Sequence, residues 1–242
     1  MEKKILSFEE AKLNRKVALD YEEDVDEDLE VDDLNDMILA MIDQAFDESD
    51  ISDDMSPEAM YRLAFNAYSD EYKRSNICHI LAYMKKSAKM GYVPSMLFLG
   101  EYYGKAEGDR KADYYESFKW YKMAADSSSA EGAYHSAKCY ESGKGVKKNL
   151  KKAFELYKAA ADEGFAPALN ELGRYYMYGI SCECDEAKAY NLFKKSSDEG
   201  CPDALYNLST CYLRGIGVEA DFCKARELKD RADKLIGRDN KI

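Results

Sequence analysis

The chain has 242 residues, 46% of them hydrophobic, which is enough for one or two domains with a sizeable core. Only four prolines and fourteen glycines are present, which excludes a low-complexity or collagen-like chain. The formal net charge is −12, but seventeen acids and no Lys or Arg lie between Asp20 and Asp54, so the remainder is mildly basic. We expect no nucleic-acid partner, because that remainder shows no dense basic patch and the acidic stretch would repel phosphate.

Residues 1–54 are predicted to form an acidic N-terminal extension. Residues 17–33 are mostly acidic with few apolar side chains, a composition that favours disorder. From 32 to 47 the apolar residues follow a 3.6-residue period, which predicts an amphipathic helix. Two interpretations of this helix stay open, a cap on the first repeat and a docking element for a partner.

Cysteine usage and hydropathy bear on the compartment. Seven cysteines form an odd set without regular spacing, unlike the disulfide framework of a small secreted chain. The first sixteen residues lack the apolar core of a signal peptide, and no stretch approaches the ~20 apolar residues that span a bilayer. We therefore expect a cytoplasmic chain with no membrane partner.

From residue 55 to 238 the sequence repeats with a period of about 36 residues. The predicted first helix of each unit has a small residue at its centre: Ala64, Gly100, Ala137, Gly173 and Ser209. In four units a tyrosine follows three residues later: Tyr103, Tyr140, Tyr176 and Tyr212. The predicted second helix has a bulky residue, namely Tyr83, Trp120, Leu156, Leu192 or Leu228, and a small one four residues later. Small residues let helices approach closely, and the tyrosine and bulky columns are expected to fill the space between them.

Glycines and prolines punctuate the repeats. Gly143, Gly179 and Gly215 are expected to end first helices, where a positive φ is easiest for glycine. Pro167 and Pro202 stand at the first turn of the following helix, where the missing N–H costs little. Each unit is therefore predicted to be a helix–turn–helix.

The pattern A-x-x-x-L-G-x-x-Y-x-x-G-x-G-V, then K-A, then A-A-x-x-G, resembles the Sel-one-like repeat, a relative of the tetratricopeptide repeat. The clearest copies begin at Gly132, Ala168 and Ala204, and the resemblance covers about residues 59 to 235. It implies an all-α fold, a right-handed α-α superhelix of about five repeats starting near 59, 95, 132, 168 and 204. The first two units depart from the pattern at the turn between their helices. The family implies protein–protein interaction, usually as an adaptor, and no common catalytic chemistry.

A binding stripe follows from helix geometry. Positions three, seven and ten or eleven of each repeat lie on one face of its first helix, and the equivalent face lines the concave groove of the related tetratricopeptide family. The candidate protein- or peptide-binding residues are Tyr61, Phe65, Tyr134, Lys138, Asn170, Arg174, Tyr178, Tyr206 and Arg214. They predict an aromatic ladder beside a cationic patch formed by Lys138, Arg174 and Arg214. The alternative is that several of the aromatics only pack against the neighbouring repeat.

Residues that could carry other chemistry do not form complete sets. The Asp-x-Asp-x-Asp run at residues 24–28 lacks the Gly and Glu that a calcium loop needs at its sixth and twelfth positions. Cys182-x-Cys184 has no matching second pair for zinc. His79 and His135 have no nucleophile motif beside them, and no phosphate-binding glycine loop occurs. We therefore expect no catalysis, metal or cofactor.

The sequence thus predicts a non-catalytic scaffold or adaptor that binds a protein or peptide segment in its concave groove. The alternative is a self-regulated or weakly homo-oligomerising module, in which the acidic N-terminal segment contacts that groove.

Overall fold

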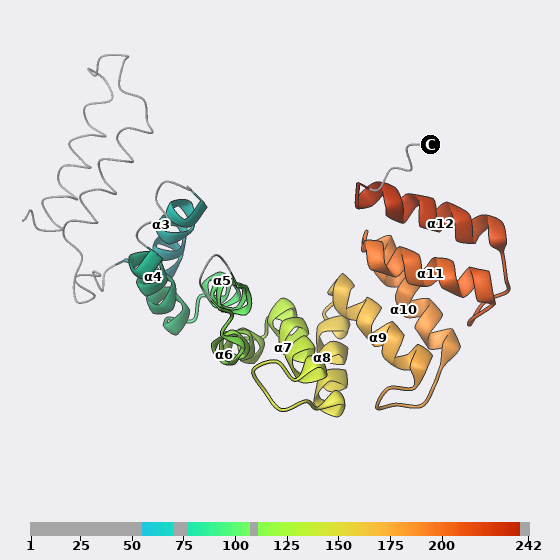
Figure 1. Ribbon diagram of the computed structural model, residues 1–242, viewed down its shortest axis with the longest axis horizontal. Coiled ribbons are helices and arrows are strands. Elements are labelled where there is room, and N and C mark those ends of the chain that lie inside the picture. Colours follow the sequence, from blue (N-terminus) through green and yellow to red (C-terminus); the bar gives the residue numbers. More distant parts are fainter. Residues whose placement is uncertain (1–54, 70–76, 107–110, 238–242) are drawn as a thin grey trace, which may run out of the picture. The chain divides into compact units, whose positions relative to one another are not determined.

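The computed structural model describes residues 55–69, 77–106 and 111–237 (Figure 1). These residues form ten α-helices and no strand, which confirms the all-helical solenoid predicted from the repeats. The helices are α3 (Pro57–Ser69), α4 (Ile77–Lys89), α5 (Val93–Gly104), α6 (Tyr114–Asp126), α7 (Ala130–Ser142), α8 (Leu150–Asp162), α9 (Ala166–Tyr178), α10 (Glu186–Asp198), α11 (Pro202–Arg214) and α12 (Phe222–Leu235). The predicted extension 1–54, with its helix at 32–47, lies outside the described residues.

The chain divides into two compact units, Met1–Ser95 and Met96–Ile242. In the first unit α3 packs against α4. In the second unit each helix from α6 to α12 packs against the next, so helix pairs stack in sequence order as a repeat architecture requires.

A hydrogen-bonded contact fixes α3 against α4 in the first unit. Met60 and Met84 are fully buried. The hydroxyl of Ser87 donates to the carbonyl oxygen of Pro57 at 2.6 Å, and the hydroxyl of Ser95 donates to Ser87 at 2.7 Å. The small residue predicted on the second helix is therefore buried and also carries a polar link between the two helices.

The small residues of the first helices allow the close approach that their column predicts. A Cβ atom added to Gly173 would lie 2.7 Å from Cε1 of Phe193, and one added to Gly100 would lie 2.6 Å from Cε1 of Tyr121. Phe193 is completely buried. The ring against Gly173 belongs to Phe193, the residue that follows Leu192 of the bulky column.

The leucines of that column have a different role in the third and fourth repeats. Leu156 and Leu192 are partly buried, and both pack against a cluster of buried residues that spans α7, α8 and α9. Successive residues on a helix point about 100° apart, so two neighbouring apolar side chains can serve two contacts. One fills the space within its own helix pair, and the other packs between repeats.

The tyrosine column fixes the turn between the two helices of a repeat through its backbone. The N-cap residue of each second helix donates its N–H to the tyrosine carbonyl oxygen at 2.8–2.9 Å. These pairs are Asp113 with Tyr103, Asn149 with Tyr140, Asp185 with Tyr176 and Asp221 with Tyr212. Each N-cap side chain also accepts the N–H of the third residue of its helix, which satisfies an otherwise orphaned donor.

Glycine is required in the turns for a further reason. Gly145 has φ +71°, and a Cβ there would lie 1.8 Å from the carbonyl oxygen of Tyr114. The α7–α8 loop therefore lies directly on the first residue of α6, in the preceding repeat. Gly217 makes the equivalent contact with Glu186, where a Cβ would lie 2.2 Å from the carbonyl oxygen. Positive φ and backbone contact together explain the Gly-x-Gly pattern.

Candidate functional site

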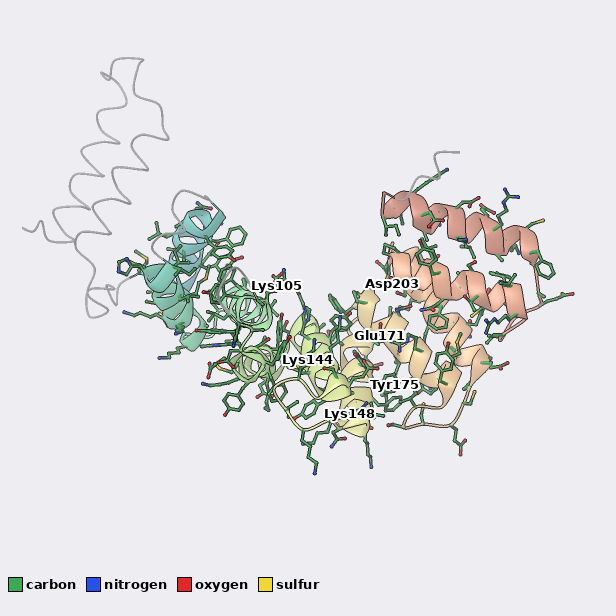
Figure 2. The ribbon with its side chains drawn as sticks, in the orientation of Figure 1. Lys105, Lys144, Lys148, Glu171, Tyr175 and Asp203 are labelled. Carbon is green, nitrogen blue, oxygen red and sulfur yellow. The ribbon has the colours of Figure 1, made fainter. Side chains whose placement is uncertain are left out.

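The first helices α7, α9 and α11 of the second unit carry polar side chains that interact across neighbouring repeats. α9 packs directly against α11, and the Asn207 side chain donates to Oδ1 of Asn170 across that contact at 2.8 Å. We define the first-helix face by the side chains that these helices carry there: Tyr134, Lys138, Glu141, Asn170, Glu171, Arg174, Tyr178, Asn207 and Arg214. Figure 2 labels Glu171 on α9 and Asp203 at the start of α11.

This face carries mixed charge, because acids stand beside the cations of the predicted patch. The guanidinium of Arg174 forms an ion pair with Glu171 on its own helix. Burial raises the pKa of Glu171, while the positive charges of Arg174 and Lys138 oppose that rise. The carboxylate of Glu141 on α7 is a further negative charge near Glu171. Sequence reasoning missed both acids: Glu171 stands at position four, beside the stripe, and Glu141 stands at position ten, where the candidates were taken from position eleven.

Tyr134 forms an aromatic wall of this face. Its ring lies 5.4 Å from the ring of Phe165, and Nζ of Lys138 lies 5.4 Å from its centroid. Burial raises the pKa of Tyr134 to about 12, and the negative charges of Glu171 and Asp203 add to the shift. The hydroxyl of Tyr134 therefore stays protonated. It lies near carboxylates of two neighbouring first helices and can donate a hydrogen bond.

Two buried tyrosines, Tyr157 and Tyr175, lie beneath Glu141 of this face. The Tyr157 hydroxyl, from second helix α8, donates to Oε2 of Glu141 at 2.8 Å. The hydroxyl of Tyr175 is buried and has no hydrogen-bond partner among the described residues. Burial and then the Glu141 charge raise the pKa of both tyrosines, so both hydroxyls remain protonated donors. The Tyr157 hydroxyl therefore holds the Glu141 carboxylate in place.

The predicted stripe residues fall into three groups in the second unit. Lys138, Tyr178 and Arg214 are exposed, and 67% of Tyr178 is accessible to solvent. Asn170 is almost fully buried and bonded to its neighbours, so it orders the surface from below. Tyr134, Arg174 and Tyr206 are half-buried, and the hydroxyl of Tyr206 donates to Asp233 of α12 at 2.5 Å. The face is therefore open on α7 and α9 and along the end of α11.

Tyr61 and Phe65 lie on α3 in the first unit. Their rings stack at 5.4 Å, and the ring of Tyr61 also lies 5.4 Å from the ring of Tyr92. Phe65 is 42% exposed. These aromatics form a separate small patch on α3.

Within residues 55–69, 77–106 and 111–237, no group of three or more His, Cys, Asp or Glu side chains could hold a metal ion. The six cysteines whose side chains are described are free thiols. The thiol of Cys182 donates to the carbonyl oxygen of Tyr175, and the thiol of Cys184 donates to that of Met177. No helix in these ranges is both long enough and apolar enough to cross a bilayer.

The repeat pattern and helix-pair geometry match a known family. A family model described as the Sel1 repeat matches residues 57–73, 93–129, 130–165, 166–201 and 202–228. The chain belongs to the Sel1 repeat family. This result confirms the resemblance on which the fold prediction rested. Sel1 repeat proteins generally act as protein-interaction scaffolds and are typically non-catalytic.

Solved structures show the same fold. A protective antigen of uropathogenic Escherichia coli with an SLR fold is 25% identical, with a TM-score of 0.66 over 82% of this chain and 40% of that protein. A Sel1 repeat protein from Oxalobacter formigenes is 22% identical, with a TM-score of 0.71 over 84% of this chain and 78% of its own. This chain therefore spans less than half the length of the E. coli protein. The search of curated proteins returned no match.

Proposed function

We propose that this Sel1 repeat chain is a non-catalytic adaptor that holds a segment of a partner protein against the first-helix face of α7, α9 and α11. The observation that carries the proposal is the hydrogen-bonded strip running from Asn207 through Asn170 and Glu171 to Arg174. A strip of amide, carboxylate and guanidinium groups fixed by its own hydrogen bonds offers donors and acceptors to a peptide backbone at little entropic cost.

Exposed side chains along the strip supply anchors. Tyr178 presents a large exposed ring, and Arg214 and Lys138 present exposed cations. Tyr and Arg are the residue types most often found as energetic anchors of protein interfaces. Because Glu141 and Glu171 alternate with these cations, the face suits a segment of mixed charge better than a strongly acidic one.

The compartment and the role as adaptor are parts of the same proposal. Six free thiols in the described chain are compatible with a reducing compartment such as the cytoplasm. The family's general role as an interaction scaffold supports a binding function over a catalytic one.

Photo-cross-linking in the native cell tests the proposal. Benzoylphenylalanine replaces Lys138 or Tyr178 on first helices, and Lys158 or Lys194 on second helices, where both lysines are exposed. We expect one and the same protein to be cross-linked from both first-helix positions and from neither second-helix position. Cross-linking of that protein only from Lys158 or Lys194 would place the binding surface on the second helices and contradict the proposal.

A further inference from the structure

The second unit carries a concentration of positive charge outside the first-helix face. Between Ser142 and Phe154 the sequence contains five lysines and no acid. All five are exposed, and they form what we call the lysine edge: Lys144, Lys147, Lys148, Lys151 and Lys152. The charge averaged over all residues outside Asp20–Asp54 is only mildly basic, and this average hides the patch.

The lysine edge is specific to one repeat. The α7–α8 loop at residues 143–149 contains three lysines, whereas the equivalent loops at 179–185 and 215–221 contain two acids each and no base. In Figure 2, Lys144 and Lys148 lie by the α7–α8 loop, below Glu171 and Asp203 in the view. A charge pattern that the repeat does not require points to a function of this loop alone.

The backbone of the lysine edge is fixed. Gly145 lies against the carbonyl of Tyr114, and the N–H of Asn149 donates to the carbonyl oxygen of Tyr140 at 2.8 Å. Nζ of Lys144 lies 4.9 Å from the Tyr114 ring centroid, and Nζ of Lys152 lies 5.3 Å from that of Tyr140. The loop therefore presents its cations on a rigid support.

Three of the lysines remain available to a ligand. Lys147, Lys148 and Lys151 form no ion pair with any residue that the structure describes. Like charges held close together repel one another, and an acidic ligand relieves that repulsion. The ligand that complements these lysines is a run of carboxylates without intervening cations.

We propose that the lysine edge binds the acidic segment Asp20–Asp54 of the same chain. This segment contains seventeen acids and no base, which makes it the complement of five lysines without an acid. At about 3.3 Å per residue, the 37 residues from Asp20 to the start of α3 span up to about 120 Å, which gives the segment a long reach. Linkage within one chain raises the effective concentration of the segment to about millimolar. The first-helix face is a poorer site for the acidic segment, because Glu141 and Glu171 carry negative charge and repel it.

The contact is electrostatic and therefore sensitive to salt. Screening shortens the range of charge interactions from about 10 Å at 0.1 M salt to about 3 Å at 1 M. The segment would occupy the edge at low ionic strength and leave it as salt rises. This inference does not depend on the proposed function, since it concerns a different surface.

Zero-length carbodiimide cross-linking of the full chain, read by mass spectrometry, tests the contact. At low salt we expect carboxylates of residues 20–54 to be joined to Lys147, Lys148 and Lys151 about fivefold more often than to the equally exposed Lys158 and Lys194. High salt should abolish the preference. An even distribution over exposed lysines at low salt would overturn the proposal.

Charge reversal and isotope mixing complete the test. The triple variant K147E/K148E/K151E should lose these cross-links, whereas K158E/K194E/K195E, with the same change in charge, should keep them. In a mixture of ¹⁴N- and ¹⁵N-labelled chains, cross-links should join segments of one label only. Mixed-label cross-links would assign the edge to a second copy and refute the intramolecular contact. Absence of cross-links together with edge-dependent retention on anionic vesicles would assign it to a lipid surface and refute the proposal equally.

Discussion

The close contact between α9 and α10 makes Gly173 the most informative position for a single substitution. A Cβ atom there would lie 2.7 Å from Cε1 and 2.9 Å from Cδ1 of Phe193. Phe193 is completely buried, so its ring has no open space into which it can move. Gly173→Ala therefore adds one methyl group to a helix contact that is already filled.

Two effects of opposite sign decide the outcome of Gly173→Ala. Replacing glycine by alanine inside a helix favours folding by about 1 kcal/mol. Overpacking a filled contact costs typically ~1–3 kcal/mol. We expect the second effect to win, with a net loss of about 1 kcal/mol, and a larger loss for Gly173→Leu because more atoms must be accommodated.

Urea denaturation followed by far-UV circular dichroism measures the change. The control is the double variant G173A/F193L, in which a smaller side chain gives the new methyl group room. Its loss should be smaller than the sum of the two single losses, since the residues are in contact. A rise in stability of about 1 kcal/mol for Gly173→Ala would show that helix propensity alone acts and would refute the close contact.

Three further substitutions probe other parts of the second unit by the same denaturation assay. Gly145→Ala should cost about 3 kcal/mol, because the new Cβ lies 1.8 Å from the Tyr114 carbonyl oxygen at a positive φ, and an unchanged midpoint would contradict that contact. Asn207→Ala should cost ~1–3 kcal/mol, because it leaves Oδ1 of the buried Asn170 without its donor, and a neutral effect would show that this bond adds no stability. Burial lowers the pKa of His135 from 6.5 to about 4. In the pH range between these two values, the imidazole binds a proton in the unfolded chain but not in the folded chain. Stability should therefore fall as pH drops through it, and His135→Phe should flatten that dependence; an unchanged slope would assign it to other groups.

The repeat columns predicted the fold because each reports a requirement of helix packing. Gly173 is small because a ring lies against it, and Gly145 is glycine because a backbone carbonyl does. The column could not tell which of Leu192 and Phe193 fills the gap, since both are apolar and adjacent. Their roles differ only once the next repeat stacks: Phe193 then fills the space within its own helix pair, and Leu192 packs between repeats.

The binding surface was less predictable than the fold. The stripe of positions three, seven and eleven placed Lys138 and Arg174 on a first-helix surface but omitted Glu171, which stands one position away and pairs with Arg174. Tyr157 reaches Glu141 from a second helix, so no pattern within one helix could indicate it. Asn170 satisfies the stripe pattern, yet its side chain is buried, because burial depends on the neighbouring repeat.

The most direct test of the adaptor account compares two matched double variants in their affinity for the cross-linked partner segment. Y178A/K138A removes an exposed tyrosine and an exposed lysine from first helices, and Y115A/K158A removes the same pair from second helices, with Tyr178 67% and Tyr115 66% exposed. By isothermal titration calorimetry, we expect Y178A/K138A to weaken binding about tenfold or more and Y115A/K158A to change it by less than about twofold. A loss of affinity in Y115A/K158A equal to or greater than that in Y178A/K138A would contradict binding on the first-helix face.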